Sequence, residues 1–422
     1  MKIRLAQVGC GGMGLRHIYG FTELKERGFD TFDVVALCDL HRSSAEHVAN
    51  EADKGLGKKP KVYMDYNEML DQEKDLDAVN IVTDTRFHHT FALKAFELGK
   101  HVAVEKPMGL TVRACHTMIE GARCAGKVLS VSENYRRDPM NRLVKALLQA
   151  KAIGDPRVVL KVSAGGSRMA QQVAAWRHMK LRGGYVLEYG VHDADLLLYF
   201  MGNVERVYAE SHLWEKVRYT TNRPLADQLA KFYGHRVKED NDKEEVFECT
   251  AEDTALAVLR FNSGAMGQLL MSIASPGEST HADVIYGSEG SLRLPGSRTG
   301  RPVQLTRDHE KFSEKDVMDL VPEFQLDDVA ATFFNSQRGL SGYNMPFEQI
   351  DRILIAIELQ DFANAILSRR QPEVTGEVGL RAVALCYAIL ESGYLRMPVS
   401  FSDVLDDKVN AYQNEINASV GL

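Results

Sequence analysis

The stretch VGCGGMGLRH, residues 8–17, decides the fold, and it directly follows an apolar run at 3–8. Four glycines lie close together within it: Gly9, Gly11, Gly12 and Gly14. Glycine weakens regular structure, so such a cluster indicates a backbone that must turn sharply or approach another group closely. The glycine cluster therefore marks a sharp turn or a place where the backbone lies close to another group.

Helical periodicity begins at Met13, so the glycines lie between a predicted strand and a predicted helix. In this context Gly9 would permit the tight turn, Gly11 would let the backbone approach a pyrophosphate, and Gly14 would let helix and strand pack closely. The amides near Gly12 and Met13 would bind the phosphates at the positive end of the helix dipole. The spacing thus predicts a dinucleotide-binding loop, and an ordinary tight turn is the alternative.

The second predicted strand, 34–38, is followed directly by Asp39. A carboxylate there can accept hydrogen bonds from both hydroxyls of an adenosine ribose, and it would repel a 2′-phosphate. The sequence therefore predicts NAD as the cofactor. His41 and Arg42 lie close by, so Arg42 is included among the cofactor-binding candidates and NADP stays an alternative.

Composition narrows the class of protein. The chain has 422 residues, of which 45% are hydrophobic and 26% charged, as in globular proteins with more than one domain. Its net charge of −7 gives no basic surface for nucleic acid or anionic lipid. The six cysteines show no zinc-site spacing, so we expect reduced thiols and no metal. No apolar run reaches membrane-spanning length and no signal peptide is evident, which predicts a cytoplasmic protein.

The first part of the chain alternates between apolar strands and helices. Strands are predicted at 3–8, 34–38, 78–82, 101–104 and 128–131, and helices at 13–27, 43–51, 91–98 and 112–125. Nearly all-apolar strands that alternate with helices indicate a parallel sheet covered on both faces. Residues 1–131 are therefore predicted to form a doubly wound α/β dinucleotide-binding domain.

Beyond this region the pattern changes. Helices are predicted at 140–150, 350–368 and 379–394, and strands with one polar face at 157–163, 255–261, 266–273 and 283–286. Alternating strands joined by glycine turns indicate a large, mostly antiparallel sheet. Residues 132–422 are thus predicted to form a second α/β domain. Two polar segments, about 215–248 and 296–343, are interpreted as insertions with loops or short helices.

The most specific pattern is IVTDTRFHHTFALKAFELGKHVAVEKP, residues 81–107, with its closing Glu105-Lys106-Pro107. It resembles the Gfo/Idh/MocA oxidoreductases, the relatives of glucose–fructose oxidoreductase and inositol dehydrogenase. The resemblance continues through ENYRRDP (133–139), AIGDPRVV (152–159), WR (176–177), GGYVLEYGVHDAD (183–195), GSEGSLRL (287–294) and GEVGLRAVALCYAILESGYLRMPV (376–399). It covers nearly the whole chain apart from the two polar insertions.

The resemblance implies a Rossmann domain followed by an α/β domain with an open sheet, whose free face often mediates oligomers. A homodimer or homotetramer is therefore predicted. It also implies the oxidation or reduction of one hydroxyl group of a sugar, cyclitol or related polyol with NAD(P).

Three residues are candidates for catalysis. Lys106 ends a parallel strand, the edge where ligands bind, and its ammonium could stabilise the alkoxide that forms during hydride loss. Glu188 and His192 are i and i+4 on a predicted helix and point the same way. An imidazole accepts a proton near neutral pH, so His192 is the expected general base and Glu188 holds or polarises the site. A solvated lysine and a surface acid–histidine pair are the alternatives.

The resemblance implies further binding residues. The cofactor groove is expected to include Thr83, His88, Glu105 and Asn134, and the substrate pocket is expected to include Tyr135, Trp176 and Arg177 beside Lys106 and His192. Three positions depart from the family pattern. Glu188 stands where aspartate is usual, Asp84 where proline is common, and Tyr135 where arginine or another polar residue is frequent.

The leading functional hypothesis is an NAD(P)-dependent sugar or polyol dehydrogenase. Two alternatives come from other classes. One is an NAD-dependent glycoside hydrolase that oxidises its sugar transiently, which the family also contains. The other is a non-catalytic NAD-binding regulator, against which the retention of both Lys106 and His192 argues.

Overall fold

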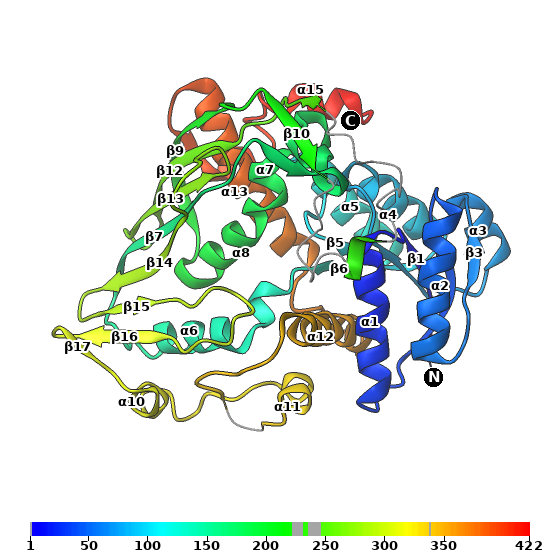
Figure 1. Cartoon of the computed structure of the whole chain (residues 1–422), viewed down its shortest axis with the longest axis horizontal. Helices are drawn as coiled ribbons and strands as arrows, with labels where there is room; N and C mark the ends of the chain where they lie inside the picture. Colours follow the sequence, from blue (N-terminus) through cyan, green and yellow to red (C-terminus); the bar gives the residue numbers. More distant parts are fainter. Residues whose placement is uncertain (1, 222–230, 235–245, 337–338) are drawn as a thin grey trace.

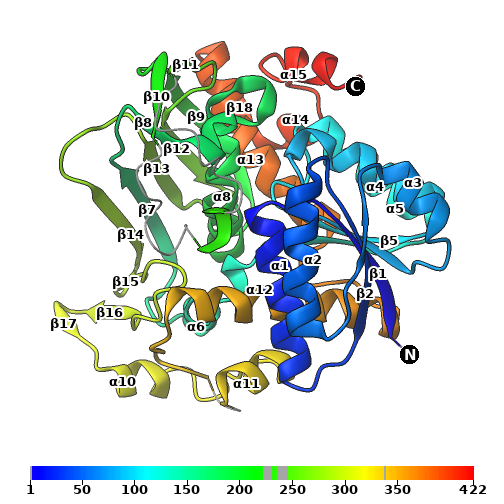
Figure 2. The same ribbon diagram turned by 45° about the vertical axis from the view of Figure 1, so that its right-hand side comes forward.

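The computed structural model describes residues 2–221, 231–234, 246–336 and 339–422. A parallel sheet with its helices forms one side of the molecule, and a large mixed sheet forms the other (Figure 1). Helices α8 (Gly190–Met201) and α13 (Gly376–Leu395) lie between the two sheets (Figure 2). This arrangement confirms the predicted α/β class with a Rossmann sheet and a second, mostly antiparallel sheet.

The first sheet has six parallel strands in the order β3-β2-β1-β4-β5-β6. Its strands are β1 (Ile3–Val8), β2 (Phe32–Cys38), β3 (Lys61–Tyr63), β4 (Ala78–Ile81), β5 (His101–Glu105) and β6 (Leu129–Ser132). Its helices are α1 (Gly12–Glu26), α2 (Arg42–Leu56), α3 (Tyr66–Gln72), α4 (His88–Glu97) and α5 (Val112–Ala125), with the short 3-10 turn η1 (Thr85–Phe87). The strand order reverses between β1 and β4, which places the glycine-rich loop at the switch point where such folds bind ligands.

The second sheet has nine strands in the order β17-β16-β15-β14-β7-β13-β12-β9-β18, and only β7 and β13 pair in parallel. Its long strands are β7 (Pro156–Ala164), β9 (Val204–His212), β12 (Thr254–Phe261), β13 (Met266–Ser272) and β14 (Thr280–Gly287). The short ones are β15 (Ser291–Arg293), β16 (Gln304–Arg307), β17 (Glu310–Lys311) and β18 (Val399–Ser400). Buried and exposed residues alternate along β12, as expected for a sheet with one covered face.

The remaining elements connect and cover these sheets. The helices are α6 (Pro139–Gln149), α7 (Gly184–Glu188), α10 (Glu314–Asp319), α11 (Asp328–Phe334), α12 (Phe347–Ser368), α14 (Phe401–Leu405) and α15 (Asn414–Ser419). Short 3-10 turns are η2 (Tyr135–Arg137), η3 (Gln172–His178) and η4 (Lys180–Arg182). A three-stranded sheet is formed by β11 (Val246–Glu248), β10 (Val217–Thr221) and β8 (Met169–Gln171).

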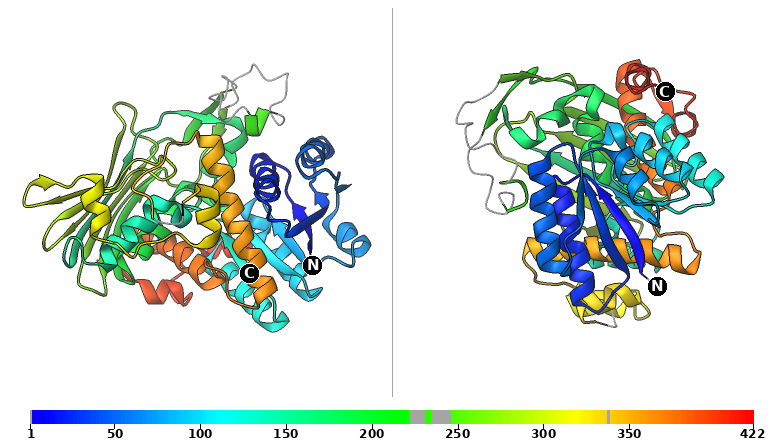
Figure 3. Two further views of the ribbon diagram at one scale, coloured as in Figure 1. Left: turned by 90° about the horizontal axis from the view of Figure 1, so that it is seen from below. Right: turned by 90° about the vertical axis from the view of Figure 1, so that its right-hand side faces the viewer.

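Helix α12 belongs by position to the second half of the chain but packs against α1 (Figure 3). One hydrophobic cluster joins residues such as Leu15 and Ile18 of α1 to Ile355 and Leu359 of α12. Gly20 lies at this contact, where a Cβ would come within 2.6 Å of the Ile355 side chain. The core of the dinucleotide-binding half is therefore completed by a late segment of the chain, and the boundary at residue 131 stays a prediction.

Helix α13 is long and apolar enough to span a membrane by length and composition, which the sequence analysis had not expected. In the structure, 72% of its apolar window is buried, and it packs against α5, α8 and β9. This burial identifies it as the central core helix of the second half. Among the described residues no other helix passes the same test.

The polar segments differ in part from the prediction of loops or short helices. The first contributes β10 and β11, although 222–230 and 235–245 lie outside the described residues. The second adds β16 and β17 to the edge of the large sheet and also forms the short helices α10 and α11. Strands this short, with mostly exposed side chains, carry little hydrophobic periodicity, so the sequence pattern could not reveal them.

Candidate active site

The glycine-rich loop joins β1 to α1 and requires its glycines. Gly9 has φ of 100°, and a Cβ there would lie 2.2 Å from the carbonyl oxygen of Val82. At Gly14 a Cβ would lie 2.1 Å from the carbonyl oxygen of Gly9. The buried Gln7 amide donates to the carbonyl oxygens of Gly9 and Gly14 at 3.1 and 2.9 Å, which fixes the turn. The loop therefore has the compact form that the dinucleotide-binding prediction requires.

Asp39 lies beside this loop at the end of β2. Its carboxylate accepts hydrogen bonds from the backbone amides of Cys10, at 2.7 Å, and His41, at 2.8 Å. Arg42 is exposed, and its guanidinium lies 3.9 Å from the carboxylate of Glu46. An anchored carboxylate next to a tight glycine turn fits the adenosine ribose of a dinucleotide, and its charge disfavours a 2′-phosphate. The residues present thus fit NAD.

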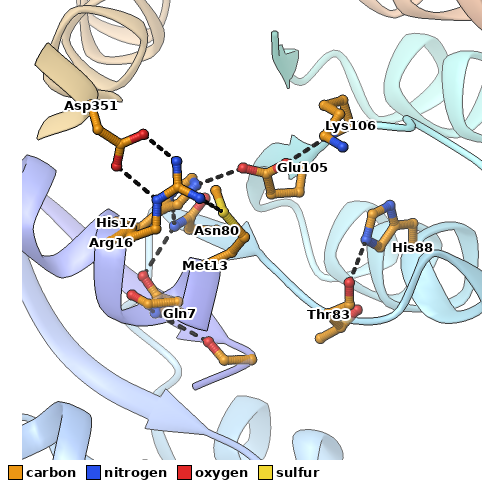
Figure 4. A network of polar contacts seen from close by, with 12 residues as sticks. Gln7, Met13, Arg16, His17, Asn80, Thr83, His88, Glu105, Lys106 and Asp351 are labelled. Carbon is orange, nitrogen blue, oxygen red and sulfur yellow. Dashed lines mark hydrogen bonds and ion pairs between the residues drawn. The ribbon is translucent and has the colours of Figure 1, made fainter. Parts of the chain in front are cut away.

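Glu105 turns inward, into a buried polar network beneath α1 (Figure 4). Its Oε1 lies 3.0 Å from Nε2 of His17, and its Oε2 accepts from the backbone amide of Lys106 at 3.0 Å. Asn80 contacts the other ring nitrogen of His17 at 3.1 Å. Burial tends to raise the pKa of Glu105, but His17 and Lys106 outweigh it and lower the pKa. Glu105 therefore supports the strand end that carries Lys106.

The carboxyl group of Glu358, from α12, lies beside this network, and within the described residues neither of its oxygens has a hydrogen-bond partner. Ligand atoms of His17, Glu105 and Glu358 lie within 4.8 Å of one another. Such residue types could hold a metal ion. Burial, however, raises the pKa of Glu358 well above its ordinary value, and Arg16 adds a positive charge near Glu105. The three side chains thus form a buried cluster of one histidine and two acidic groups.

His88 links the loop after β4 to the strand end after β5. One ring nitrogen lies 2.9 Å from the carbonyl oxygen of Pro107, and the other lies 3.1 Å from that of Thr83. Burial lowers the pKa of His88, so the ring is neutral and can donate to only one of these carbonyls at a time. His88 is fully buried. His88 therefore connects the backbone segment that contains Thr83 to the one that contains Lys106 and Pro107.

Lys106 points toward the second half of the chain. Its Nζ donates to the backbone carbonyl oxygen of Glu188 at 2.9 Å. The Glu188 side chain instead accepts from Oγ1 of Thr85 at 2.7 Å, and the Arg177 guanidinium lies 4.0 Å away. Burial raises the pKa of Glu188, an effect that Lys106, Arg177 and Thr85 oppose. Glu188 thus contacts Lys106 through its main chain, which no side-chain substitution removes.

His192 has an acidic partner that the sequence analysis did not assign. Its Nδ1 lies 2.8 and 2.7 Å from the two carboxylate oxygens of Glu133, which follows β6. Burial lowers the pKa of His192 despite Glu133, and Lys106 lowers it further. Among the described residues no hydrogen bond engages Nε2. A neutral ring that donates from Nδ1 to Glu133 therefore presents Nε2 as a proton acceptor.

Tyr135 forms one wall of this site. Its ring is stacked on the His192 ring, with centroids 3.9 Å apart and an interplanar angle of 5°. Arg298, from the second polar segment, donates to the Tyr135 hydroxyl at 3.0 Å and to Asp351 at 3.1 Å. Asp351 also pairs with Arg16 of α1. The position of His192 is therefore tied through Tyr135 and Arg298 to the helix that follows the glycine-rich loop.

Trp176 and Arg177 lie together beside Glu188. The Arg177 guanidinium is 5.0 Å from the Trp176 ring centroid and donates to the Tyr189 hydroxyl at 3.1 Å. Asn134 is buried and its Oδ1 has no hydrogen-bond partner within the part of the chain that the structure describes. An orphaned buried oxygen is costly, so it fits a position that a bound molecule completes.

The structure thus brings Lys106, Glu188 and His192 into one site, with Tyr135 and Arg177 at its sides. Glu133, Thr85 and Arg298 contact the candidate residues His192, Glu188 and Tyr135, and the sequence analysis did not name them. Glu133 opens the ENYRRDP stretch, so its place after an apolar strand was an available signal. Arg298 lies in a segment without periodicity, where no signal was available.

Comparison with known proteins agrees with this geometry. Residues 3–133 match the oxidoreductase family with an NAD-binding Rossmann fold, and residues 141–293 match the GFO/IDH/MocA C-terminal domain. The chain therefore belongs to the Gfo/Idh/MocA family of NAD-binding oxidoreductases.

Curated relatives cover nearly the whole chain. Myo-inositol 2-dehydrogenase of Thermotoga maritima is 25% identical over 96% of this chain and 100% of its own length. The NAD(+)-dependent scyllo-inositol 2-dehydrogenase of Bacillus subtilis is 26% identical over 90% of this chain and 93% of its own. An Agrobacterium radiobacter oxidoreductase, solved with NAD+, L-tartaric acid and magnesium, has a TM-score of 0.69 at 19% identity, and the alignment covers 95% of this chain and 99% of that one.

Proposed function

We propose that this protein is an NAD-dependent dehydrogenase that acts on one hydroxyl group of a sugar, cyclitol or related polyol. The observation that carries the proposal is the Glu133–His192 pair, at 2.7 and 2.8 Å, next to Lys106. Such a pair is the arrangement that a general base requires. The names of the two inositol dehydrogenase relatives support the substrate class.

The residues divide the work as follows. Glu133 holds the neutral tautomer of His192 that carries its proton on Nδ1, so Nε2 accepts the proton of the substrate hydroxyl. Lys106 exchanges its bond to the Glu188 carbonyl for one to the substrate oxygen and stabilises the developing alkoxide. NAD, when bound, supplies the hydride acceptor. Tyr135 holds the His192 ring in place by stacking on it, and Trp176 lies against the Arg177 guanidinium, which is the polar group on this side of the site.

A substrate screen tests this function. Purified protein is given NAD and a panel of sugars, cyclitols and glycosides, and reduced nicotinamide is followed by absorbance. Lys106→Met should lower kcat at least about a hundredfold without weakening NAD binding, because the lost group acts on the transition state. Glycoside hydrolysis without net reduction would favour the hydrolase alternative. NAD binding with neither activity would favour the regulator.

The proposed oligomer is a homodimer or homotetramer that uses the outer face of the large sheet. Four large apolar side chains there are exposed by 43–53%: Tyr208, Leu256, Val258 and Met266. An apolar patch of this kind is typical of an interface. Light scattering should show an oligomer for the wild type and a smaller species for Val258→Glu. A wild-type monomer would contradict the proposal.

A further inference from the structure

Residues 231–234, a short described piece of the first polar segment, lie against α1 (Figure 1, green). Phe232 is only 2% exposed. Its ring centroid lies 6.3 Å from that of Tyr19 and 5.5 Å from the guanidinium carbon of Arg16. A buried aromatic ring in such contacts fixes this piece to the dinucleotide-binding half, from which it is remote in sequence.

The side chains on either side of Phe232 contact two further parts of the molecule, α12 and the glycine-rich loop. Lys231 pairs with Glu348 of α12 at 2.6 Å. Tyr233 lies on the glycine-rich loop, where a Cβ at Gly12 would come within 2.1 Å of its Cε1 and 2.4 Å of its Cζ. Gly12 does not have a positive φ, so its backbone would accept any residue. The ring of Tyr233 is therefore what excludes a side chain at Gly12.

Tyr233 also lies between the two halves of the molecule. It is close enough to interact electrostatically with Arg16, from α1, and with Arg177, beside Glu188. The start of α1 is the place where a Rossmann loop holds the pyrophosphate of its cofactor. Tyr233 thus stands beside the region that the dinucleotide must reach.

We propose that residues 231–234 form a strap across the glycine-rich loop, and that Tyr233 is a cofactor-contacting residue on the pyrophosphate side of the dinucleotide site. The inference rests on the proposed use of NAD at this loop. Phe232 and Lys231 anchor the strap, and the ring of Tyr233 shields the phosphate-binding amides of the loop from water. Shielding strengthens hydrogen bonds to a charged group, because the local dielectric constant falls.

Direct binding measurements test the strap without any turnover. Calorimetry gives the Kd of NAD, of ADP-ribose, which keeps the pyrophosphate but lacks nicotinamide, and of adenosine, which has neither. Tyr233→Ala should weaken NAD and ADP-ribose about tenfold and leave adenosine unchanged. Tyr233→Phe keeps the ring and should stay within about threefold of wild type. Tyr394→Ala, on the exposed end of α13, is the matched control.

Each other outcome has a definite meaning. Unchanged or tighter NAD binding by Tyr233→Ala would overturn the proposal, and tighter binding would show that the ring blocks the site. Loss of NAD affinity with ADP-ribose unaffected would place the ring at the nicotinamide and overturn the pyrophosphate assignment. Failure of the wild type to bind NAD would instead contradict the proposed function.

The contact itself can be tested without cofactor. Gly12→Ala should lower the Tm of the wild type, because the new methyl group collides with the Tyr233 ring. In the Tyr233→Ala background the same change should be neutral or stabilising, since alanine is favoured over glycine in a helix. Equal effects of Gly12→Ala in both backgrounds would show that the ring does not lie on the loop.

Discussion

Glu133 and His192 lie 59 positions apart in the chain, yet Oε2 of the glutamate is 2.7 Å from Nδ1 of the histidine. The glutamate follows a strand of the Rossmann sheet, and the histidine lies in the first turn of α8. The pair therefore spans the two halves of the molecule. The backbone amide of Tyr135 also donates to Glu133, at 3.0 Å, so the carboxylate is fixed in place.

Glu133→Gln should lower kcat at least about a hundredfold and change the Kd of NAD little. An amide can present its NH2 to Nδ1, which favours the tautomer with the proton on Nε2 and removes the base from the substrate side. Steady-state kinetics with a substrate from the screen, together with calorimetry for NAD, measure the two effects. Activity close to that of the wild type would show that Glu133 does not orient His192.

The acidic limb of the pH–rate profile should report His192. The base works only when neutral, so kcat/KM should fall as the pH drops through its pKa, which burial places below the ordinary value of 6.5. Glu133 opposes this lowering, so Glu133→Gln should move the limb to still lower pH. The control is the dependence of the Kd of NAD on pH, measured over the same pH range. An acidic limb that moves to higher pH in Glu133→Gln would contradict the assignment of this limb to His192.

Asp39→Asn should lower the ratio of kcat/KM with NAD to kcat/KM with NADP about tenfold or more, because the variant no longer repels a 2′-phosphate. The amide oxygen can still accept from one of the two backbone amides that Asp39 binds, so the fold should be retained. The ratio of kcat/KM values for the two cofactors is the measurement, with Tm as the control. An unchanged ratio would mean that another residue selects the cofactor.

His101 should make the fold sensitive to acid. Burial lowers its pKa to about 4, and Nδ1 accepts a hydrogen bond from the Val128 amide at 3.0 Å, which protonation would abolish. The folded pKa lies below the unfolded value of 6.5, so this stability is present above pH 6.5 and is lost as the pH falls toward 4.

The test is Tm between pH 7 and 4.5. His101→Asn, whose side-chain oxygen can accept the same bond, should flatten the decline, whereas the exposed His281→Asn should leave it unchanged. His178, whose pKa burial also lowers to about 4, keeps part of the slope in both variants. An equal slope in wild type and His101→Asn would refute the role of His101.

Local patterns were enough to predict much of the fold. The glycine spacing and the apolar strands revealed the parallel sheet, and the strand end at Lys106 and the helix position of His192 indicated the catalytic candidates. The pattern did not reveal what each side chain contacts. Glu188 and His192 were expected to act together, but their carboxylate and ring bind Thr85 and Glu133 instead. Such partners come from elements that are distant in the chain. Hydrophobic periodicity predicts each element but not which elements pack together.

The polar segments were the least predictable parts for a related reason. Arg298 has φ of 63° and reaches Tyr135 from a loop, and Tyr233 reaches Gly12 from the short described piece 231–234. Neither position carries a hydrophobic repeat or a motif. Their roles depend on contacts with residues that are remote in sequence, which only the folded chain displays.

The packing of α12 against α1 has a consequence for synthesis in the cell. When the N-terminal sheet emerges from the ribosome, the apolar face of α1 that packs on α12 is exposed to solvent. It stays exposed until α12 has been synthesised, near the end of the chain. We therefore expect a nascent or truncated product that ends near residue 131 to need chaperone protection, and the excised nucleotide-binding half to be a poor independent unit.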